Sequence, residues 1–119
     1  MDLNKMIEQV RKNTDSSKVG MITSHLGVVR RTSRSGGEVL SIDVTYDQKA
    51  IQTIILDIKK MPGIAEVLVE TREGRLNVGE EIMAVVVAGD IRENVFPALV
   101  SAVNRIKKEA SRKTENMKK

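Results

Sequence analysis

The run from Glu81 to Gly89 constrains the fold of this chain more than any other segment, because it is apolar at nearly every position. A strand with this pattern is typical of the centre of a sheet whose two faces are both covered. The run is also far too short to span a bilayer, which takes about 20 apolar residues in a helix. We therefore predict a buried central strand with helices packed on its sheet.

The remaining apolar patterns divide the chain into short helices and strands. Helical spacing of apolar residues, β-branched runs and turn residues predict the elements in this order: a helix at 2–12, strands at 19–30 and 39–46, a helix that Asp47 caps and Met61-Pro62-Gly63 ends, strands at 66–71 and 81–89, and a helix from Asn94. Strands and crossover helices do not alternate regularly in this order. The pattern therefore predicts the α+β class, with a mainly antiparallel sheet.

The length of 119 residues suits a single domain, which we expect to span 1–119. Starting the last helix at Asn94 places Pro97 in its first turn, where the missing N–H would have no acceptor within the helix. Residues 111–119 carry four cations and one glutamate. Chain ends are often poorly ordered, so we expect a basic tail at 111–119 that is free to be disordered.

The composition argues against several classes of protein. The chain has no cysteine and therefore no disulfide, thiolate metal site or cysteine nucleophile, and its single histidine argues against a zinc site. It contains neither of the common glycine-rich phosphate-binding motifs. One Phe and one Tyr are too few for the stacking surfaces that single-stranded nucleic acids require. Because the N-terminus has no apolar signal core and no apolar run is long enough to span a bilayer, we expect a cytoplasmic protein with no membrane partner. Because aromatic residues are so few, we also expect no nucleic-acid partner.

Several separated segments end in single cations. Arg30 closes the strand at 19–30, Arg92 follows the apolar run, and Lys107 lies near the end of the last helix. Segments that are distant in the sequence and each end in a cation are suited to surrounding one anionic ligand. We therefore predict an anion-binding site, and we expect the lone His25 to be structural or exposed.

Three segments stand in a characteristic order. They are Gly20-Met-Ile-Thr-Ser-His-Leu-Gly27-Val-Val-Arg30 followed by Ile42-Asp43, then Thr71-Arg-Glu-Gly-Arg-Leu-Asn-Val-Gly-Glu80, then the positions Arg92, Phe96, Ala98 and Arg105-Ile106-Lys107. In this order, and at nearly the same spacing, they resemble the large, catalytic subunit of molybdopterin synthase from about Asp15 to about Lys113. The specificity lies in the colinearity of the segments, because no single motif is diagnostic.

The resemblance implies a fold of the α/β hammerhead type and a role in molybdenum cofactor biosynthesis. Such subunits form a homodimer, and each end of it accepts a small ubiquitin-like subunit whose C-terminal Gly-Gly carries a thiocarboxylate. Sulfur passes from that sulfur-carrier subunit to cyclic pyranopterin monophosphate, so the implied activity is that of a sulfurtransferase. The implied substrate is a phosphorylated pterin, and we expect neither a metal nor a cofactor.

Position by position, the resemblance implies that Arg30 and Arg92 bind the anionic pterin and that Lys107 is a catalytic lysine. A phosphate suits the bidentate fork of arginine, and a lysine can polarise a thiocarboxylate or hold an acyl intermediate. The ungapped alignment puts Thr114 at the second catalytic lysine, and Lys113, one position earlier, is the candidate to replace it. On a helix that replacement requires a shift of register, because neighbouring residues point about 100° apart.

Two functions therefore remain open. One is an enzyme subunit that transfers sulfur to the pterin, and Arg30, Arg92 and Lys107 favour it. The other is a non-catalytic dimeric relative that keeps the fold and an anion-binding pocket but binds another ligand or partner. Ile91, where the family has a histidine, and Thr114 favour this second function.

Overall fold

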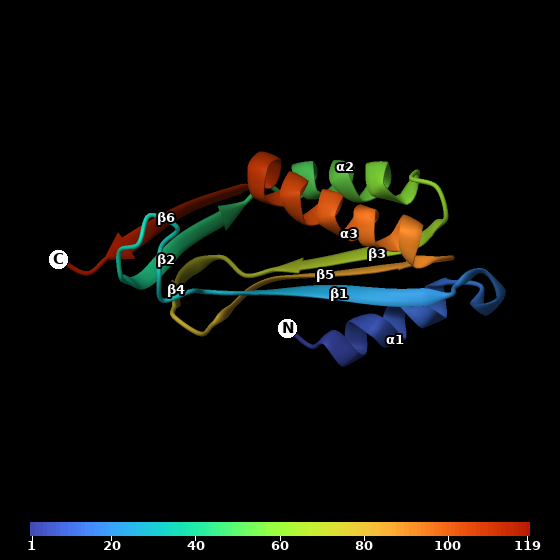
Figure 1. The fold of residues 1–119 in the computed structure, drawn as a ribbon, viewed down its shortest axis with the longest axis horizontal. Helices are drawn as coiled ribbons and strands as arrows, with labels where there is room; N and C mark the ends of the chain where they lie inside the picture. The colour runs from blue at the N-terminus through green and yellow to red at the C-terminus, as the bar shows by residue number, and fades with distance from the viewer.

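The computed structural model describes residues 1–119, which form two three-stranded antiparallel sheets and three α-helices (Figure 1). The first sheet has the order β1 (Met21–Val28), β5 (Glu81–Gly89), β3 (Ile64–Thr71), and the second has the order β4 (Gly74–Asn77), β2 (Val39–Tyr46), β6 (Ser111–Met117). The helices are α1 (Leu3–Asn13), α2 (Gln48–Lys59) and α3 (Arg92–Arg105), with a 3-10 turn η1 (Ser16–Lys18) and a π turn η2 (Ile106–Ala110). The α+β class with antiparallel pairing is confirmed, although the strands form two sheets where we expected one.

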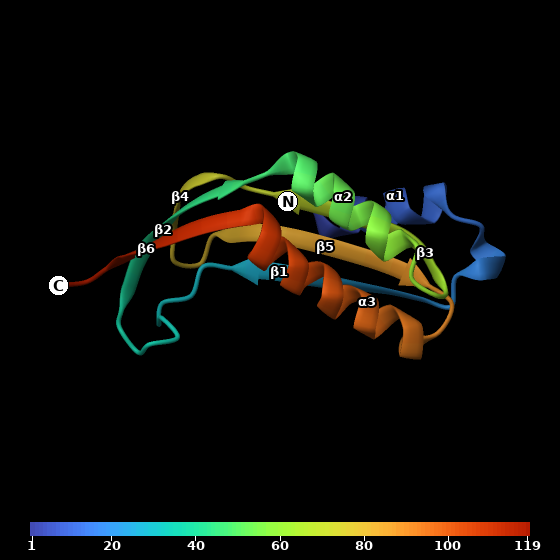
Figure 2. The ribbon, with the colours of Figure 1, turned by 90° about the horizontal axis from the view of Figure 1, so that it is seen from above.

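The two sheets lie one after the other along an elongated molecule of 54 × 25 × 24 Å. Helices α2 and α3 cover one face of the first sheet and α1 covers the other, while the second sheet extends beyond them toward the C-terminus (Figure 1). Seen from above, α2 and α3 run side by side over the first sheet, and the chain passes from α3 through the π turn η2 into β6 (Figure 2). None of the helices combines the length and the apolar character needed to cross a bilayer.

The central strand is β5, as the apolar run predicts. It pairs with β1 on one side and with β3 on the other, so that Val85 lies opposite both His25 and Val69. Successive side chains of a strand point to opposite faces, and both faces are buried here. Met83, Val85 and Val87 pack in one cluster with residues of α2 and α3, and Ala84, Val86 and Ala88 pack in a second cluster with α1. Burial of each valine side chain stabilises the fold by about 1.5–3 kcal/mol. Strand β5 therefore holds α2 and α3 on one face of the first sheet and α1 on the other.

Helix α2 begins and ends where the sequence predicts. The side chain of Asp47 accepts a hydrogen bond from the backbone N–H of Ala50 at 3.1 Å, which satisfies one of the free donors of the first turn. Ile51, Ile54 and Ile58 recur at helical spacing and are buried against the first sheet.

The prediction of a disordered tail is wrong for Ser111–Met117, which form β6 and pair with β2 along its length. The backbone becomes extended at Ser111 after the π turn, and the Ala110 carbonyl accepts a bond of 2.7 Å from the Asp47 N–H. Cross-strand contacts then hold the polar strand, since Asn116 donates to Ser41 Oγ at 2.9 Å. Pairing with a distant strand therefore decides the structure of a segment whose own composition favours disorder.

Helix α3 starts at Arg92, two residues earlier than predicted. The N–H groups of Asn94 and Val95 both donate to the Ile91 carbonyl at 3.0 Å, which closes the first turn without a side-chain cap. Pro97 therefore lies inside the helix, in its second turn, where it removes the hydrogen bond that the Glu93 carbonyl would accept.

Candidate functional site

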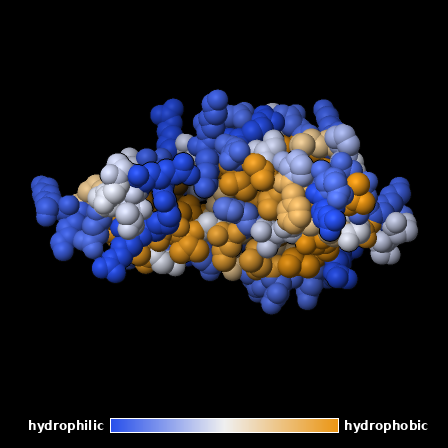
Figure 3. All heavy atoms as spheres, in the orientation of Figure 1, coloured by the Kyte–Doolittle hydropathy of each residue, from blue (hydrophilic) through white to orange (hydrophobic).

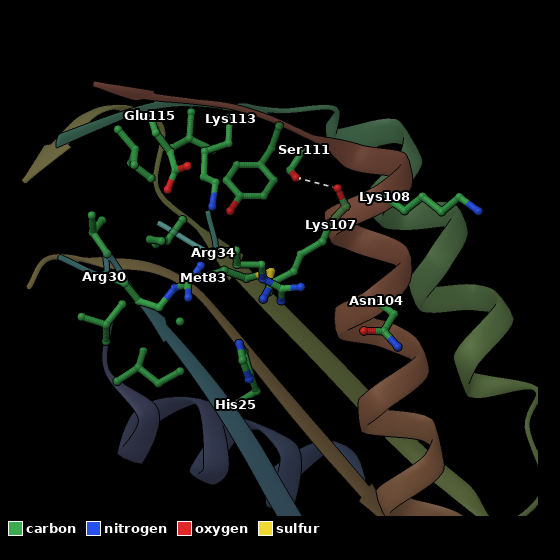
Figure 4. Close-up of a pocket in the computed structure, with 18 residues that line it drawn as sticks. His25, Arg30, Arg34, Met83, Asn104, Lys107, Lys108, Ser111, Lys113 and Glu115 are labelled. Atoms are coloured by element: carbon green, nitrogen blue, oxygen red, sulfur yellow. Dashed lines mark hydrogen bonds between the residues drawn. The ribbon is translucent and has the colours of Figure 1, made fainter. Parts of the chain in front are cut away.

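A pocket of about 730 Å³ opens where the two sheets meet. Its wall is mainly apolar and includes Val29, Ile42, Val44 and Met83, while its rim carries polar and charged side chains (Figure 4). The end of β1, the loop that follows it, the π turn after α3 and the start of β6 all contribute to this rim. The rim therefore gathers residues from two stretches that are far apart in the sequence, one at the end of β1 and one between α3 and β6.

Four cations lie around this pocket: Arg30, Arg34, Lys107 and Lys113. Figure 4 shows their side chains directed toward its interior, whereas Lys108, which also borders the pocket, extends away from it. None of these four takes part in any ion pair of the structure, although Arg75, Arg105 and other cations elsewhere do. The single acidic residue of the rim, Glu115, accepts a hydrogen bond of 3.0 Å from Ser33. Apart from Glu115, the charged side chains that line the pocket are cations, which suits an anionic ligand.

These cations act on one another. The pKa of Lys107 lies below its ordinary value of 10.5, first because the side chain is partly desolvated and then because Lys113, Arg34 and Arg30 repel its proton. Lys107 is therefore easier to deprotonate than a free surface lysine. A lysine in that state can act as a nucleophile, and a charged one can stabilise a developing anion.

His25 forms part of the pocket wall and is half-buried. Its Nε2 atom is the one buried side-chain nitrogen or oxygen that has no hydrogen-bond partner. Desolvation, and then the charge of Lys107, hold the pKa of His25 below its ordinary value of 6.5, so the ring is mainly neutral at pH 7. Burial and Glu73 raise the pKa of Tyr46, another wall residue, to about 12. The wall therefore offers two neutral polar groups beneath the cations.

The alternation of β6 brings only one of positions 113 and 114 to the pocket. Lys113 lies opposite Val44, a wall residue, and extends into the pocket, whereas Thr114 pairs with Asp43 and does not line it (Figure 4). Neighbouring residues of a strand point to opposite faces. The register shift that a helix would require does not arise, because the helical segment ends at Ala110 and Ser111–Met117 form a strand.

Arg92 does not lie in this pocket. It stands at the first turn of α3, about 20 Å along the helix axis from Lys107 at a rise of about 1.5 Å per residue, and it pairs with Glu93 at 3.1 Å. Its side chain is 78% exposed. The prediction that Arg30, Arg92 and Lys107 converge is therefore correct for Arg30 and Lys107 and wrong for Arg92 within one protomer.

The sequence pattern did not single out Arg34. It stands in the loop Thr32-Ser33-Arg34-Ser35-Gly36-Gly37, whose small polar residues indicate only a flexible connection. A cation between serines and glycines carries no helical or strand period, so nothing local tells which way it points. Only the packing of this loop against β6 brings Arg34 to the pocket.

The comparisons with known proteins agree with this architecture. Residues 1–109 match the family model described as "MoaE protein". The chain is similar in structure to the molybdopterin synthase of Staphylococcus aureus, with a TM-score of 0.77, 23% identity, and coverage of 93% of this chain and 84% of that one. No curated protein matches the sequence significantly.

Two further solved structures share the fold. The molybdopterin biosynthesis MoaE protein of Burkholderia ambifaria has a TM-score of 0.78 and 23% identity over 98% of this chain and 82% of that one. A complex of subunits 1 and 2 of the molybdopterin-converting factor of Helicobacter pylori has a TM-score of 0.65 and 15% identity over 98% of this chain and 80% of that one. At these identities the likeness establishes the fold.

Proposed function

Since the chain belongs to the MoaE protein family, we propose that it works as the large subunit of a molybdopterin synthase in molybdenum cofactor biosynthesis. The observation that carries the proposal is the group of four cations, Arg30, Arg34, Lys107 and Lys113, which surround one pocket without any ion pair. A phosphorylated pterin is an anion with a flat heterocyclic ring system that carries hydrogen-bond donors and acceptors. It would meet cations at the rim and an apolar wall inside.

In this proposal the protein is a sulfurtransferase, and the chain's own residues divide the work. Arg30 binds the phosphate of cyclic pyranopterin monophosphate, because a guanidinium can hold two phosphate oxygens at once. Lys107, whose pKa is lowered, polarises the thiocarboxylate of the sulfur carrier, or its neutral amine accepts the acyl group as an amide while the C–S bond breaks and the sulfur passes to the pterin. Lys113 supplies the second lysine from the opposite rim. The cytoplasmic location that we expect from the sequence belongs to the same proposal.

A small ubiquitin-like subunit ending in Gly-Gly is the proposed sulfur donor. The structure from Helicobacter pylori, which has the same fold, is a complex of two subunits, and this supports a partner for the present chain. The pocket opens at its rim to solvent between the two sheets, so an extended C-terminal segment has a route to Lys107. Two glycines suit such a route, because they carry no side chain that would collide with the rim.

A homodimer is also part of the proposal. Strand β1 is an edge strand of its sheet and exposes Leu26 and Val28, and helix α3 exposes Phe96 and Val100. Figure 3 shows apolar atoms gathered along the middle of the face seen in Figure 1, between hydrophilic ends. An exposed apolar area of this kind is typical of a protein–protein contact. A second protomer would also be the only source of an Arg92 side chain for the pocket.

Reconstitution tests the proposed function. The protein is mixed with a thiocarboxylated small subunit and cyclic pyranopterin monophosphate, and the dithiolene product is measured. We expect dithiolene product with the wild type and none with Lys107→Ala. Because Lys107 is an exposed residue, its replacement by alanine should keep the fold. Lys108→Ala is the matched control, because that neighbouring lysine extends away from the pocket, and it should stay active. Full activity of Lys107→Ala would remove Lys107 from the mechanism.

The second candidate function is a non-catalytic relative that binds an anion in the same pocket. The observation in its favour is that the α3 cap is Ile91, an exposed side chain that can neither donate nor accept a hydrogen bond, where the family has a histidine. In this case the reconstitution yields no dithiolene, while calorimetry still detects binding of an anionic ligand.

A further inference from the structure

An ion-pair network lies beside the turn that carries Lys107. Arg105, the last residue of α3, donates from Nε and Nη2 to the two carboxylate oxygens of Glu109, at 2.7 and 3.0 Å. Its Nη1 atom donates to Asp57 Oδ2 on α2 at 2.8 Å. One guanidinium therefore joins the π turn η2, which contains both Lys107 and Glu109, to the neighbouring helix.

This network and the pocket lie on different sides of η2. Ile106 and Ala110 are buried in the core and fix one face of the turn. Successive helical residues point about 100° apart, so positions 105 and 109 fall on one flank of that buried face and position 107 on the other. The contacts agree, because Arg105 reaches α2 whereas Lys107 extends into the pocket (Figure 4).

The network also engages the acid that stands closest in sequence to Lys107. Glu109 is two positions away, but both of its oxygens are bound by Arg105. These bonds hold the pKa of Glu109 below its ordinary value of 4.5, so the carboxylate stays ionised and paired. The charges that lower the pKa of Lys107 are those of the other three pocket cations. Glu115, the acid of the pocket, makes no ion pair with any of them.

We propose that Arg105 is a positioning residue that ties η2 to α2 and to Glu109, and so keeps Lys107 directed into the pocket without an ion pair. The inference deepens the proposed function and rests on it for the role of Lys107 in sulfur transfer. Arg105 itself does not line the pocket. A bidentate arginine within a network of charges is the geometry in which a partly exposed ion pair has a measurable effect.

Competitive acetylation tests this assignment in the isolated protein. Acetic anhydride acylates neutral amines, and site-resolved mass spectrometry gives the rate at Lys107 relative to the exposed Lys12 on α1 in the same sample. The pH dependence of that rate gives the pKa of Lys107, which we expect below 10.5 in the wild type. Arg105→Ala loosens the turn and frees Glu109. The relative rate at pH 8 should then fall about three-fold or more, because the pKa rises by about 0.5 or more.

Two further variants separate positioning from general stability. Arg105→Lys keeps the charge but not the fork, so its relative rate should fall less than that of Arg105→Ala. Arg75→Ala is the matched control, because Arg75 makes a similar bidentate pair with Asp43 at 3.0 and 3.1 Å, outside the pocket lining. Both alanine variants lose ion pairs and some stability, but only Arg105→Ala should change the acetylation profile of Lys107.

The outcomes separate this inference from the proposed function. The role of Arg105 would be overturned by an unchanged Lys107 profile in Arg105→Ala, by an equal change in Arg75→Ala, or by a wild-type Lys107 pKa of 10.5 or above. These results count whether or not the protein makes dithiolene. The expected change in Arg105→Ala together with a failed reconstitution by the wild type would overturn the proposed function and keep the positioning role.

Discussion

At the scale of single residues, the pocket favours ligand binding over stability. Arg30, Arg34, Lys107 and Lys113 repel one another in the folded chain, and unfolding separates them. The folded pKa of Lys107 is lowered, so the unfolded chain binds that proton more tightly. The resulting stability penalty is fully present at pH 7. It is relieved only as the pH rises past the lowered folded pKa toward the ordinary value of 10.5.

Removing this charge should therefore stabilise the protein. We expect Lys107→Met, which keeps the apolar stem, to raise the melting temperature at pH 7 and low salt by roughly 1–5 °C, from a charge interaction of about 0.2–1 kcal/mol. The rise should shrink as salt screens the charges. Lys108→Met is the control for lysine removal and should change the melting temperature less. Calorimetric scanning checks this, and a lower melting temperature for Lys107→Met would show that repulsion does not dominate.

His25 makes the stability of the fold depend on pH on the acidic side of neutrality, whereas Lys107 does so on the basic side. Its folded pKa lies below 6.5, so the unfolded chain takes up a proton more readily, and stability is lost as the pH falls from about 6.5 through the folded pKa. We expect the wild type to lose more stability than His25→Phe between pH 7.5 and pH 5. Because His25 is the sole histidine, its imidazole NMR signals report the pKa without ambiguity. A measured pKa above 6.5 would contradict the desolvated position of the ring.

At the scale of elements, β6 links the fold to the site. It supplies Lys113 to the rim and Glu115 to the Arg34 loop, and both side chains lie on the pocket side of the strand because they are two positions apart. The strand also completes the second sheet by pairing with β2. A segment that looks like a basic tail in the sequence thus determines the shape of the pocket.

Exchanging two neighbouring residues tests this register. We expect the double variant Lys113→Thr with Thr114→Lys to lose dithiolene formation as fully as Lys113→Ala, because position 114 lies on the other face of β6. The exchange preserves composition and net charge, so the melting temperature should change by no more than a few degrees. An active double variant would mean that the segment does not keep this strand register during turnover.

The same elements show how far sequence patterns reach. Strand β5 and helix α2 follow from local signals, since the apolar run and the Asp47 cap are contained within the elements that they define. Local signals do not predict strands β4 and β6. Their residues, such as Arg75 and Lys113, are polar, and these segments are extended only because they pair with β2. Arg30 and Lys107 were predictable as pocket residues because they lie at the ends of periodic elements. Arg34 was not, because the position of its loop depends on the hydrogen bond from Ser33 to Glu115, which lies 82 positions further along the chain.

At the scale of the whole molecule, the position of Arg92 bears on assembly. The pocket lies where the two sheets meet, and Arg92 lies at the far end of α3 (Figure 1). If Arg92 binds ligand, a second protomer must bring it to the pocket, and the two sites of a dimer must then each combine residues of both chains. Strand β1 and helix α3 each expose apolar side chains that such a contact would cover.

Mixing two inactive variants tests this arrangement. We expect Lys107→Ala and Arg92→Ala to be inactive alone and to regain about a quarter of the wild-type activity when co-expressed in equal amounts, because half of the dimers then contain one intact composite site. Co-expression of Lys107→Ala with Lys113→Ala is the control and should stay inactive, because both lysines belong to one protomer's pocket. Light scattering on the same samples reports the mass. A shared site would be excluded if the mixture of Lys107→Ala and Arg92→Ala were dimeric but inactive, or if Arg92→Ala were active alone. Each pocket would then work with the residues of its own chain.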